Sequence, residues 1–225
     1  MRQEYQNEIK ISKGGNSSVD KPLTGVKART RQLLLSTALN MLEEGWFPSI
    51  TELANAAGVA RATAYRYFPT QSALVSAVVD ESLGPILSWQ PKEKTAEKRM
   101  SELLTFAYPR MIEHEGALRA TLQVSLQQWA EEKANKQTND ERLIRGYRKK
   151  LLALATEPLL DVLPEEDYQR LQYALSLVYG SEIFMVLKDI WGLEYDGIDN
   201  VTQWMAKALI NQAKTDVKNE DATSN

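Results

Sequence analysis

Residues 49–69 read SITELANAAGVARATAYRYFP, and this stretch decides how the chain folds around it. Ser49 and Glu52 have the spacing of a capping box, in which each side chain accepts a hydrogen bond from the other residue's backbone N–H at a helix start. Gly58 tolerates the positive φ that often ends a helix, and Pro69 cannot continue one. The stretch therefore predicts a helix from residue 50, a tight turn at Gly58, and a second short helix over 60–68.

The sequence on either side predicts one further helix each way. Upstream, apolar residues recur every four positions from Leu34 to Leu42, which predicts a helix over 27–44. Downstream, apolar residues predict a helix from about residue 70 towards Gly84–Pro85. We expect a compact domain over 27–88, preceded by a flexible tail over 1–26 that is rich in Gly, Ser and Pro.

The remainder of the chain predicts only helices. Alternating β-branched segments bounded by turns do not occur, so the expected fold class is all-α, with a three-helix N-terminal domain and a C-terminal helical bundle. We expect this second domain over 89–215, followed by a flexible C-terminus over 216–225. Its amphipathic helices are predicted over 95–114, 117–133, 139–161, 165–190 and 198–215.

Composition excludes several kinds of protein. The 225 residues include no cysteine and one histidine, so disulfides, thiolate metal sites and paired-histidine metal sites are excluded. His114 lies between Glu113 and Glu115, but adjacent helical side chains point apart, so they do not predict a metal site. We expect no catalytic residues, no metal and no cofactor. Neither a signal peptide nor an 18-residue apolar run is present, so we expect a cytoplasmic protein without membrane contact.

Charge is distributed unevenly along the chain. The formal net charge is -3, yet residues 1–31 carry seven Lys/Arg against three Asp/Glu, whereas residues 151–225 carry five against thirteen. Such runs are commonly solvated faces. The basic N-terminal part is nevertheless compatible with a polyanionic partner.

The predicted helix over 60–68 has two contrasting sides. At 100° per residue, Ala64 and Phe68 share one apolar side, and Arg66 lies opposite them. Tyr65 and Tyr67 lie between the two sides, so each can bury its ring and expose its hydroxyl. A helix with a small and cationic outer face suits the major groove of DNA, where its side chains meet base edges and the tyrosine hydroxyls meet phosphates. The alternative is that both tyrosines are boundary aromatics of an ordinary helical domain.

The stretch from Arg31 to Leu74 resembles the tetracycline-repressor (TetR) family of bacterial regulators, most closely over 51–69. The resemblance implies that 60–67 is the recognition helix, that Thr51 reaches DNA from the preceding helix, and that Thr63, Tyr65 and Tyr67 touch DNA. The DNA-binding residues that we expect are Lys27, Arg29, Thr51, Arg61, Ala62, Thr63, Tyr65, Arg66, Tyr67 and Gln71.

Three positions depart from the family pattern. Ala60 stands where the family usually has a capping Ser, which costs the recognition helix about 1 kcal/mol. Gln71 stands where many members have a Lys that contacts a phosphate, and Ala62 stands where Gly is frequent. Lys27, Arg29 and Arg31 could compensate by reaching the DNA backbone or minor groove, although they could equally belong to a solvated basic tail.

For the second domain, the resemblance implies effector binding and dimerisation through the last two long helices. Each of these two helices has an apolar stripe that could instead pack within one subunit, and the residues expected to line the pocket could be ordinary core. The expected dimer residues are Leu177, Val178, Ser181, Met185, Val201, Trp204, Met205 and Ala208. The expected pocket residues are Phe106, Tyr108, Met111, Trp129, Tyr147 and Tyr173, with Pro109 predicted to kink its helix.

We therefore expect a homodimeric transcriptional repressor that binds a palindromic double-stranded DNA operator and is released by a small-molecule effector. One alternative is an architectural or chromosome-organising DNA-binding protein without an effector. Another is an all-helical enzyme or a carrier of an apolar ligand. The sequence shows no catalytic nucleophile together with a general base, which argues against the enzyme.

Overall fold

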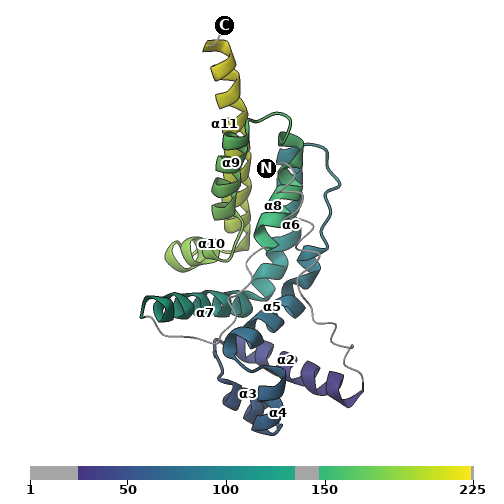
Figure 1. The fold of residues 1–225 in the computed structure, drawn as a ribbon. Coiled ribbons are helices and arrows are strands. Elements are labelled where there is room, and N and C mark those ends of the chain that lie inside the picture. The colour runs from purple at the N-terminus through teal and green to yellow at the C-terminus, as the bar shows by residue number, and fades with distance from the viewer. Residues whose placement is uncertain (1–24, 135–146, 224–225) are drawn as a thin grey trace.

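The computed structural model describes residues 25–134 and 147–223, and every regular element within these two ranges is a helix. The all-α prediction is confirmed. In Figure 1 the helices nearest the N-terminus lie at one end of the molecule, and α9 and α11 run side by side at the other. The elements are α2 (Val26–Glu43), α3 (Ile50–Ala56), α4 (Arg61–Tyr67), α5 (Gln71–Leu87), α6 (Ala96–Glu113), α7 (Glu115–Lys133), α8 (Tyr147–Thr156), the 3₁₀ turn η1 (Glu157–Leu159), α9 (Glu165–Val178), α10 (Glu182–Phe184), the π-helical η2 (Met185–Ile190) and α11 (Tyr195–Thr223).

The predicted capping box is present at the start of α3. The Ser49 hydroxyl accepts a hydrogen bond from the Glu52 N–H at 3.2 Å, and the Glu52 carboxylate accepts one from the Ser49 N–H at 2.8 Å. Gly58 has a φ of 66°, which suits a residue without a side chain at the turn before α4. At α4 itself the N-cap residue is Ala60, which supplies no side-chain hydrogen bond. The local sequence signals around the turn therefore act as predicted.

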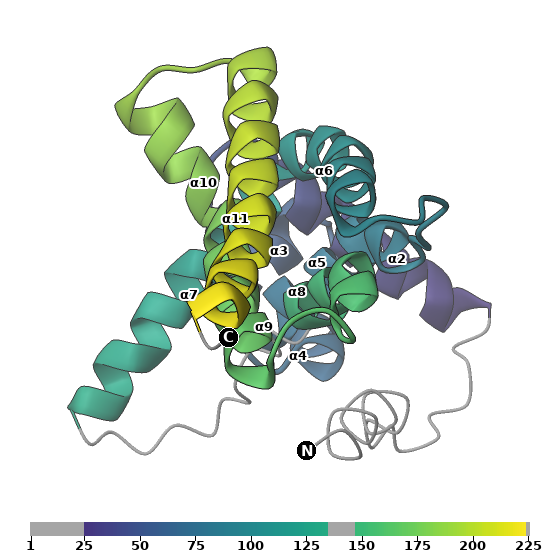
Figure 2. The same ribbon diagram turned by 90° about the horizontal axis from the view of Figure 1, so that it is seen from above.

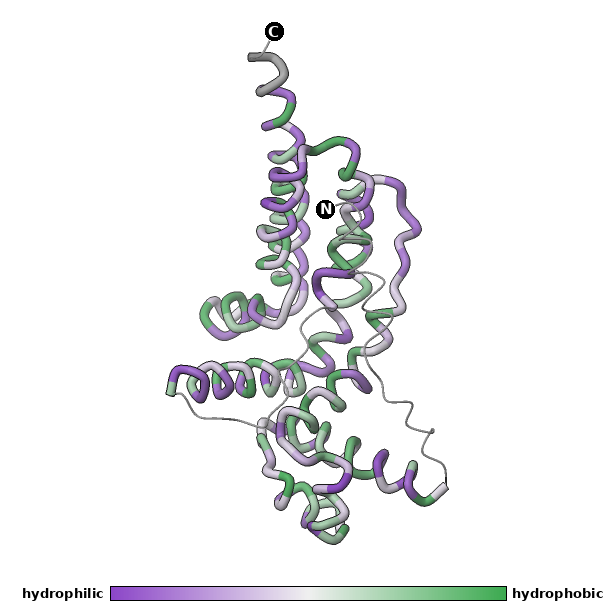
Figure 3. Tube along the Cα trace, in the orientation of Figure 1, coloured by the Kyte–Doolittle hydropathy of each residue, from purple (hydrophilic) through white to green (hydrophobic). Residues whose placement is uncertain are grey.

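Two hydrophobic cores organise the described residues. The first lies among α2, α3, α4 and the N-terminal half of α5, and it also includes Ala117, Ala120 and Val124 of α7. The second lies among α6, α8, α9 and α11, and it receives Ile86 from the end of α5. Figure 3 shows green and purple alternating along the helices, as expected of helices that bury one side. Thus α5 spans both cores, and α7 packs on the N-terminal domain rather than on the C-terminal bundle alone.

Several helices end where the sequence pattern did not predict. The helix predicted over 165–190 ends at Val178, and a π-helical segment forms over 185–190. At this break the Arg148 guanidinium lies against Gly180, where a Cβ would be 2.2 Å from it, and donates a hydrogen bond to the Ser176 carbonyl oxygen in the last turn of α9. The view from above in Figure 2 shows α10 diverging from α11 after this break.

The ends of the last long helices also differ from the prediction. α11 starts at Tyr195 and continues to Thr223, so residues 216–223 are helical where a flexible C-terminus was predicted. α5 continues through the Gly84–Pro85 pair to Leu87, since a proline near a helix end leaves the earlier hydrogen bonds intact. The predicted helix over 139–161 is helical from Tyr147 to Thr156, and its first part lies outside the described residues, as does most of the tail over 1–26.

The junction between α6 and α7 falls at His114, and Gly116 lies inside α7 rather than between the two helices. A Cβ on Gly116 would lie 2.3 Å from the Leu42 carbonyl oxygen, so only glycine permits this approach of α7 to the end of α2. The Glu43 carboxylate accepts hydrogen bonds from the N–H groups of Gly116 and Ala117 at 2.9 and 3.3 Å. The N-terminus of α7 is thereby fixed to the N-terminal domain.

Among the helices of the described ranges, none has both the length and the apolar character that a membrane span needs.

Candidate nucleic-acid interface and adjoining cavity

The recognition helix predicted from the sequence, α4, has the two sides that the pattern indicates. Ala64 and Phe68 are buried in the first core, and on the opposite side Arg61, Ala62 and Arg66 are exposed while Thr63 is partly exposed. The burial of two residues four positions apart anchors the helix. The outward side presents small and cationic groups, as predicted.

Tyr65 holds Arg61 beside the helix. The Arg61 guanidinium carbon lies 5.4 Å from the centre of the Tyr65 ring, within the range of a cation–π contact. Hydrogen bonds from Thr51 and then from Arg61 lower the pKa of Tyr65. Thr51, Arg61 and Tyr65 thus form one polar cluster that joins α3 to α4. The prediction placed Thr51 at the DNA surface, and the structure places it next to the recognition helix.

Tyr67 connects the recognition helix to the start of α2. Its hydroxyl donates a hydrogen bond to the Lys27 carbonyl oxygen at 3.1 Å, and its ring lies 5.5 Å from the Arg66 guanidinium carbon. Lys27 and Arg29 are both exposed. The predicted contact of the Tyr67 hydroxyl with a phosphate stays a prediction, and in this structure the hydroxyl donates to the protein backbone. Its role is to hold the basic start of α2 beside α4.

Gln71 is also directed at the protein. Its side-chain amide donates a hydrogen bond to the Pro48 carbonyl oxygen at 2.9 Å, which ties the start of α5 to the loop before α3. Thr70 caps α5 by accepting a hydrogen bond from the Ala73 N–H at 3.1 Å. The expected phosphate contact by Gln71 stays a prediction, with one amide hydrogen already engaged.

The exposed residues of α4 and those at the start of α2 are brought together by the Tyr67–Lys27 hydrogen bond. Their cationic groups are Lys27, Arg29, Arg61 and Arg66, and their small groups are Ala62 and Thr63. Such a surface offers charge to phosphates and a narrow helix face to base edges. In the ranges that the structure describes, no three His, Cys, Asp or Glu residues come together in a way that could hold a metal ion.

The model of the family described as bacterial regulatory proteins, tetR family, matches residues 34–78, which include α3, α4 and most of the first core. The N-terminal part of the chain is therefore similar to the DNA-binding domain of TetR-family transcriptional regulators. The match ends within α5, so it identifies the DNA-binding domain and leaves the C-terminal domain to the structure.

Solved structures extend the likeness to the fold of both domains. A TetR transcriptional regulator from Rhodococcus sp. RHA1 has a TM-score of 0.56 at 16% identity, covering 83% of this chain and 97% of that one. A tetR-family transcriptional regulator from Streptomyces coelicolor has a TM-score of 0.61 at 18% identity, covering 88% and 87% respectively. No curated protein matches the chain. At these identities the likeness concerns the fold alone.

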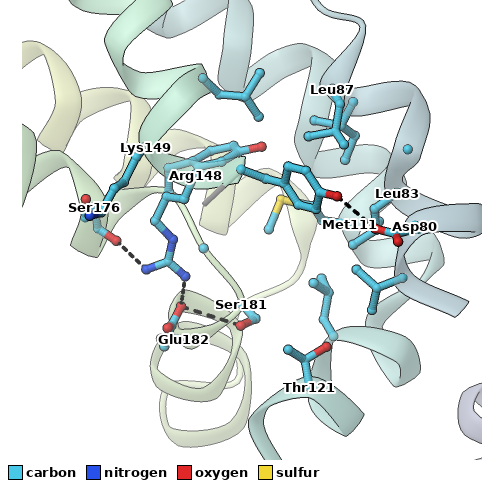
Figure 4. A pocket seen from close by; sticks show the side chains of 18 of the residues that line it. Asp80, Leu83, Leu87, Met111, Thr121, Arg148, Lys149, Ser176, Ser181 and Glu182 are labelled. Carbon is cyan, nitrogen blue, oxygen red and sulfur yellow. Dashed lines mark hydrogen bonds and ion pairs between the residues drawn. The ribbon is translucent and has the colours of Figure 1, made fainter. Parts of the chain in front are cut away.

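A cavity of about 380 Å³ lies between the N-terminal domain and the C-terminal bundle. Its walls come from α5, α6, α7, α8 and the segment that joins α9 to α10 (Figure 4). The apolar part of the lining is Val79, Leu83, Ile86, Leu87, Met111, Leu118, Leu122 and Leu151.

Of the six predicted pocket residues, Met111 and Tyr147 line the cavity and four do not. Phe106 and Tyr173 are exposed, and Trp129 is 60% exposed on the outer part of α7. Tyr108 is fully buried, and its hydroxyl donates to the Val178 carbonyl oxygen, which makes it a core residue. For these four residues a role in ligand binding stays a prediction, because aromatic character does not indicate which side of a helix faces a cavity.

The polar part of the lining includes residues that the sequence did not predict: Asp80, Arg148, Ser176 and Glu182. Arg148 donates to the Ser176 carbonyl oxygen at 2.9 Å and pairs with the Glu182 carboxylate, and these bonds close one wall. Across the cavity, the Tyr147 hydroxyl donates to an Asp80 carboxylate oxygen at 3.1 Å. Burial and the Asp80 charge raise the pKa of Tyr147. No local pattern links Asp80 to a residue 67 positions away, so the sequence carried no signal for this pair.

The predicted dimer residues divide by their exposure in one protomer. Leu177 is 74% exposed and Trp204 is 70% exposed, and Met185 and Ala208 are also exposed, while Ser181, Val201 and Met205 are partly buried. Val178 is completely buried in the second core, so its side chain is not available on the surface of the protomer. The exposed members lie on α9, η2 and α11, and α9 and α11 pack side by side (Figure 1).

Proposed function

We propose that this protein is a TetR-family regulator: a dimeric, cytoplasmic repressor that binds a palindromic operator and is released when a small molecule occupies the cavity. On this proposal α4 enters the major groove, with Arg61, Ala62, Thr63 and Arg66 at the base edges. Lys27 and Arg29 contact the phosphates. One recognition helix reads few base pairs, and two helices about 34 Å apart read a palindrome.

The observation that carries effector release is the position of α5. Only three residues, Phe68, Pro69 and Thr70, separate it from the recognition helix. Its first half packs in the same core as α4, and its second half supplies Asp80 and Leu83 to the cavity wall. A ligand that enlarges the cavity therefore moves the helix to which α4 is attached. A coupling of about 1–3 kcal/mol would change operator affinity by about 5–150-fold.

The exposed face on α9 and α11 supports dimerisation. Large apolar residues that stay exposed on a regular helix pair cost free energy unless another surface covers them. A second copy of the same face would bury Tyr173, Leu177 and Trp204 in a four-helix arrangement. This arrangement would set the distance between the two recognition helices.

The experiment has two stages. First, the full chain selects its operator from random DNA duplexes, and the enriched sequences are examined for a palindrome. Second, the enriched duplex is titrated by fluorescence anisotropy with and without a library of small molecules, and a reporter gene behind the operator is measured in cells. A repressor lowers reporter expression, and a compound that weakens operator binding restores it.

A cavity variant provides the matched control. Leu83→Trp places a larger side chain in the cavity, so it should keep operator binding and lose the response to the active compound. Enrichment of many unrelated sequences without a palindrome would contradict the proposal and favour an architectural protein. A reporter that rises when the protein is present would show activation instead of repression.

A further inference from the structure

The cavity contains a carboxylate that has no cationic partner among the described residues. Four charged residues line it: Asp80, Arg148, Lys149 and Glu182. Arg148 and Glu182 pair with each other, and Arg148 also donates to the Ser176 carbonyl oxygen, so this pair forms a neutral part of the wall. Asp80 accepts a hydrogen bond from the Tyr147 hydroxyl at 3.1 Å. That bond orients the carboxylate and leaves its charge uncompensated.

The remaining cation lies away from Asp80. Figure 4 shows Lys149 beside Ser176 on one side of the cavity, and Asp80 on the opposite side beyond Met111. Lys149 and Asp80 are both exposed, so water competes with a ligand for either charge, and the hydrogen bond from the Tyr147 hydroxyl is what fixes the orientation of Asp80 beside an aromatic ring. The arrangement favours a positive charge at the Asp80 side of the cavity.

The rest of the lining suits an apolar body. Leu83, Leu87, Met111 and Leu118 contribute aliphatic or thioether surface. Tyr147 and Tyr179 also line the cavity, and aromatic rings attract cations through their faces. A volume of about 380 Å³ lies within the usual range for small-molecule sites.

We infer that the effector is an apolar molecule with one positive charge, and that Asp80 is the residue that recognises this charge. The inference rests on the proposed function, because it names the chemistry of the ligand at the same cavity. It also gives the ligand a direct contact on α5, since Asp80 belongs to the helix that follows the recognition helix. A cation at Asp80 competes with the Tyr147 hydroxyl, which is a bond between α5 and α8.

The test uses three compounds that share one apolar body and differ in charge. They are 4-phenylbutylamine, which is protonated at neutral pH, the neutral 4-phenylbutan-1-ol, and the anionic 4-phenylbutyrate. Calorimetric titration of the full chain without DNA should show the amine binding roughly tenfold more tightly than the other two, as expected for an ion pair reinforced by an aromatic contact.

Two variants test whether the preference for the amine comes from Asp80. Asp80→Asn keeps an acceptor oxygen for Tyr147 and removes the charge, so it should weaken the amine by roughly tenfold and leave the alcohol unchanged. Glu81→Gln removes an equal charge from the neighbouring residue. The Glu81 side chain accepts a hydrogen bond from Gln32 and does not line the cavity, so this variant should leave the affinities for all three compounds unchanged.

Equal binding of all three compounds, preference for the acid, or an unchanged amine affinity in Asp80→Asn would overturn the inference. Preference for the acid that is lost in Lys149→Gln would place the selective charge on the other side of the cavity. Operator release is measured separately by anisotropy. Selective binding of the amine without release of the protein from the operator would therefore support the inference and contradict the proposed function. Release by the alcohol or the acid would support the proposed function and contradict the inference.

Discussion

At the scale of single residues, Tyr67 joins the two parts of the proposed DNA-binding surface. Its hydroxyl bonds to the Lys27 backbone, and Lys27 and Arg29 are the exposed cations at the start of α2. Removing the hydroxyl frees this segment, which must then be ordered again when DNA binds.

Tyr67→Phe should weaken operator binding by about 3- to 10-fold, the value of one hydrogen bond of about 1 kcal/mol. The ring stays in place, so circular dichroism and the midpoint of thermal unfolding should change little. Thr63→Ala is the companion variant: it should weaken binding to the operator but not to unrelated DNA, because Thr63 is partly exposed on the outward side of α4. Unchanged affinity in both variants would refute this surface.

Ala60 is the second residue with a testable effect. It has φ and ψ of −63° and 138°, the extended conformation of an N-cap residue, but its side chain cannot accept a hydrogen bond. Ala60→Ser should raise the free energy of unfolding by about 0.5–1 kcal/mol and the thermal midpoint by about 2–4 °C. Ala60→Gly is the matched control and should not raise it. A serine variant no more stable than the glycine variant would show that α4 gains nothing from a cap.

At the scale of elements, the junction of α2 with α7 is fixed by a close backbone approach. Gly116 lies against the Leu42 carbonyl, and Glu43 accepts from the first N–H groups of α7. The same end of α7 is tied to η2: Arg119 bonds to Asp189 at 2.6 Å, and Lys188 pairs with Glu115. Although burial opposes it, the bonds from Lys188 and Arg119 lower the pKa of Glu115. α7 therefore connects the DNA-binding domain to the segment that follows the cavity wall.

Gly116→Ala should separate α7 from α2, because its Cβ would meet backbone that cannot rotate away. We expect a loss of about 1–3 kcal/mol in the free energy of unfolding and a weaker response of operator binding to the effector. Glu43→Gln keeps an acceptor at the same junction and should cost less than about 1 kcal/mol. Chemical denaturation measures both, and a Gly116→Ala protein as stable as the parent would contradict the close approach.

At the scale of the whole molecule, two tryptophans are similarly exposed but lie on different surfaces. Trp204 is 70% exposed on α11, which packs against α9, and Trp129 is 60% exposed on the outer part of α7. Trp204→Arg should give a folded monomer whose operator affinity falls at least tenfold, because one recognition helix then binds alone. Trp129→Arg should stay dimeric. Light scattering and sedimentation measure the oligomeric state of both variants. A Trp204→Arg protein that is still a dimer would show that Trp204 of α11 is not needed at the interface.

Much of the DNA-binding domain could be predicted because its signals are local. The Ser49–Glu52 capping box, the turn at Gly58 and the sides of α4 each depend on residues within one or two helical turns, and all three are as expected. The family match over 34–78 covers the same local patterns.

The cavity and the breaks in the last helices were decided by tertiary structure. Asp80 and Tyr147, on α5 and α8, are 67 positions apart in the chain, and Arg148 of α8 reaches Gly180 and the last turn of α9. Helical periodicity tells which residues share a side but not what that side faces, so it could not separate the cavity residue Met111 from the buried Tyr108 or the exposed Phe106. The sequence by itself determined a helix suited to DNA, since short-range hydrogen bonding and burial specify it. Only packing between distant helices decided where a ligand could act on it.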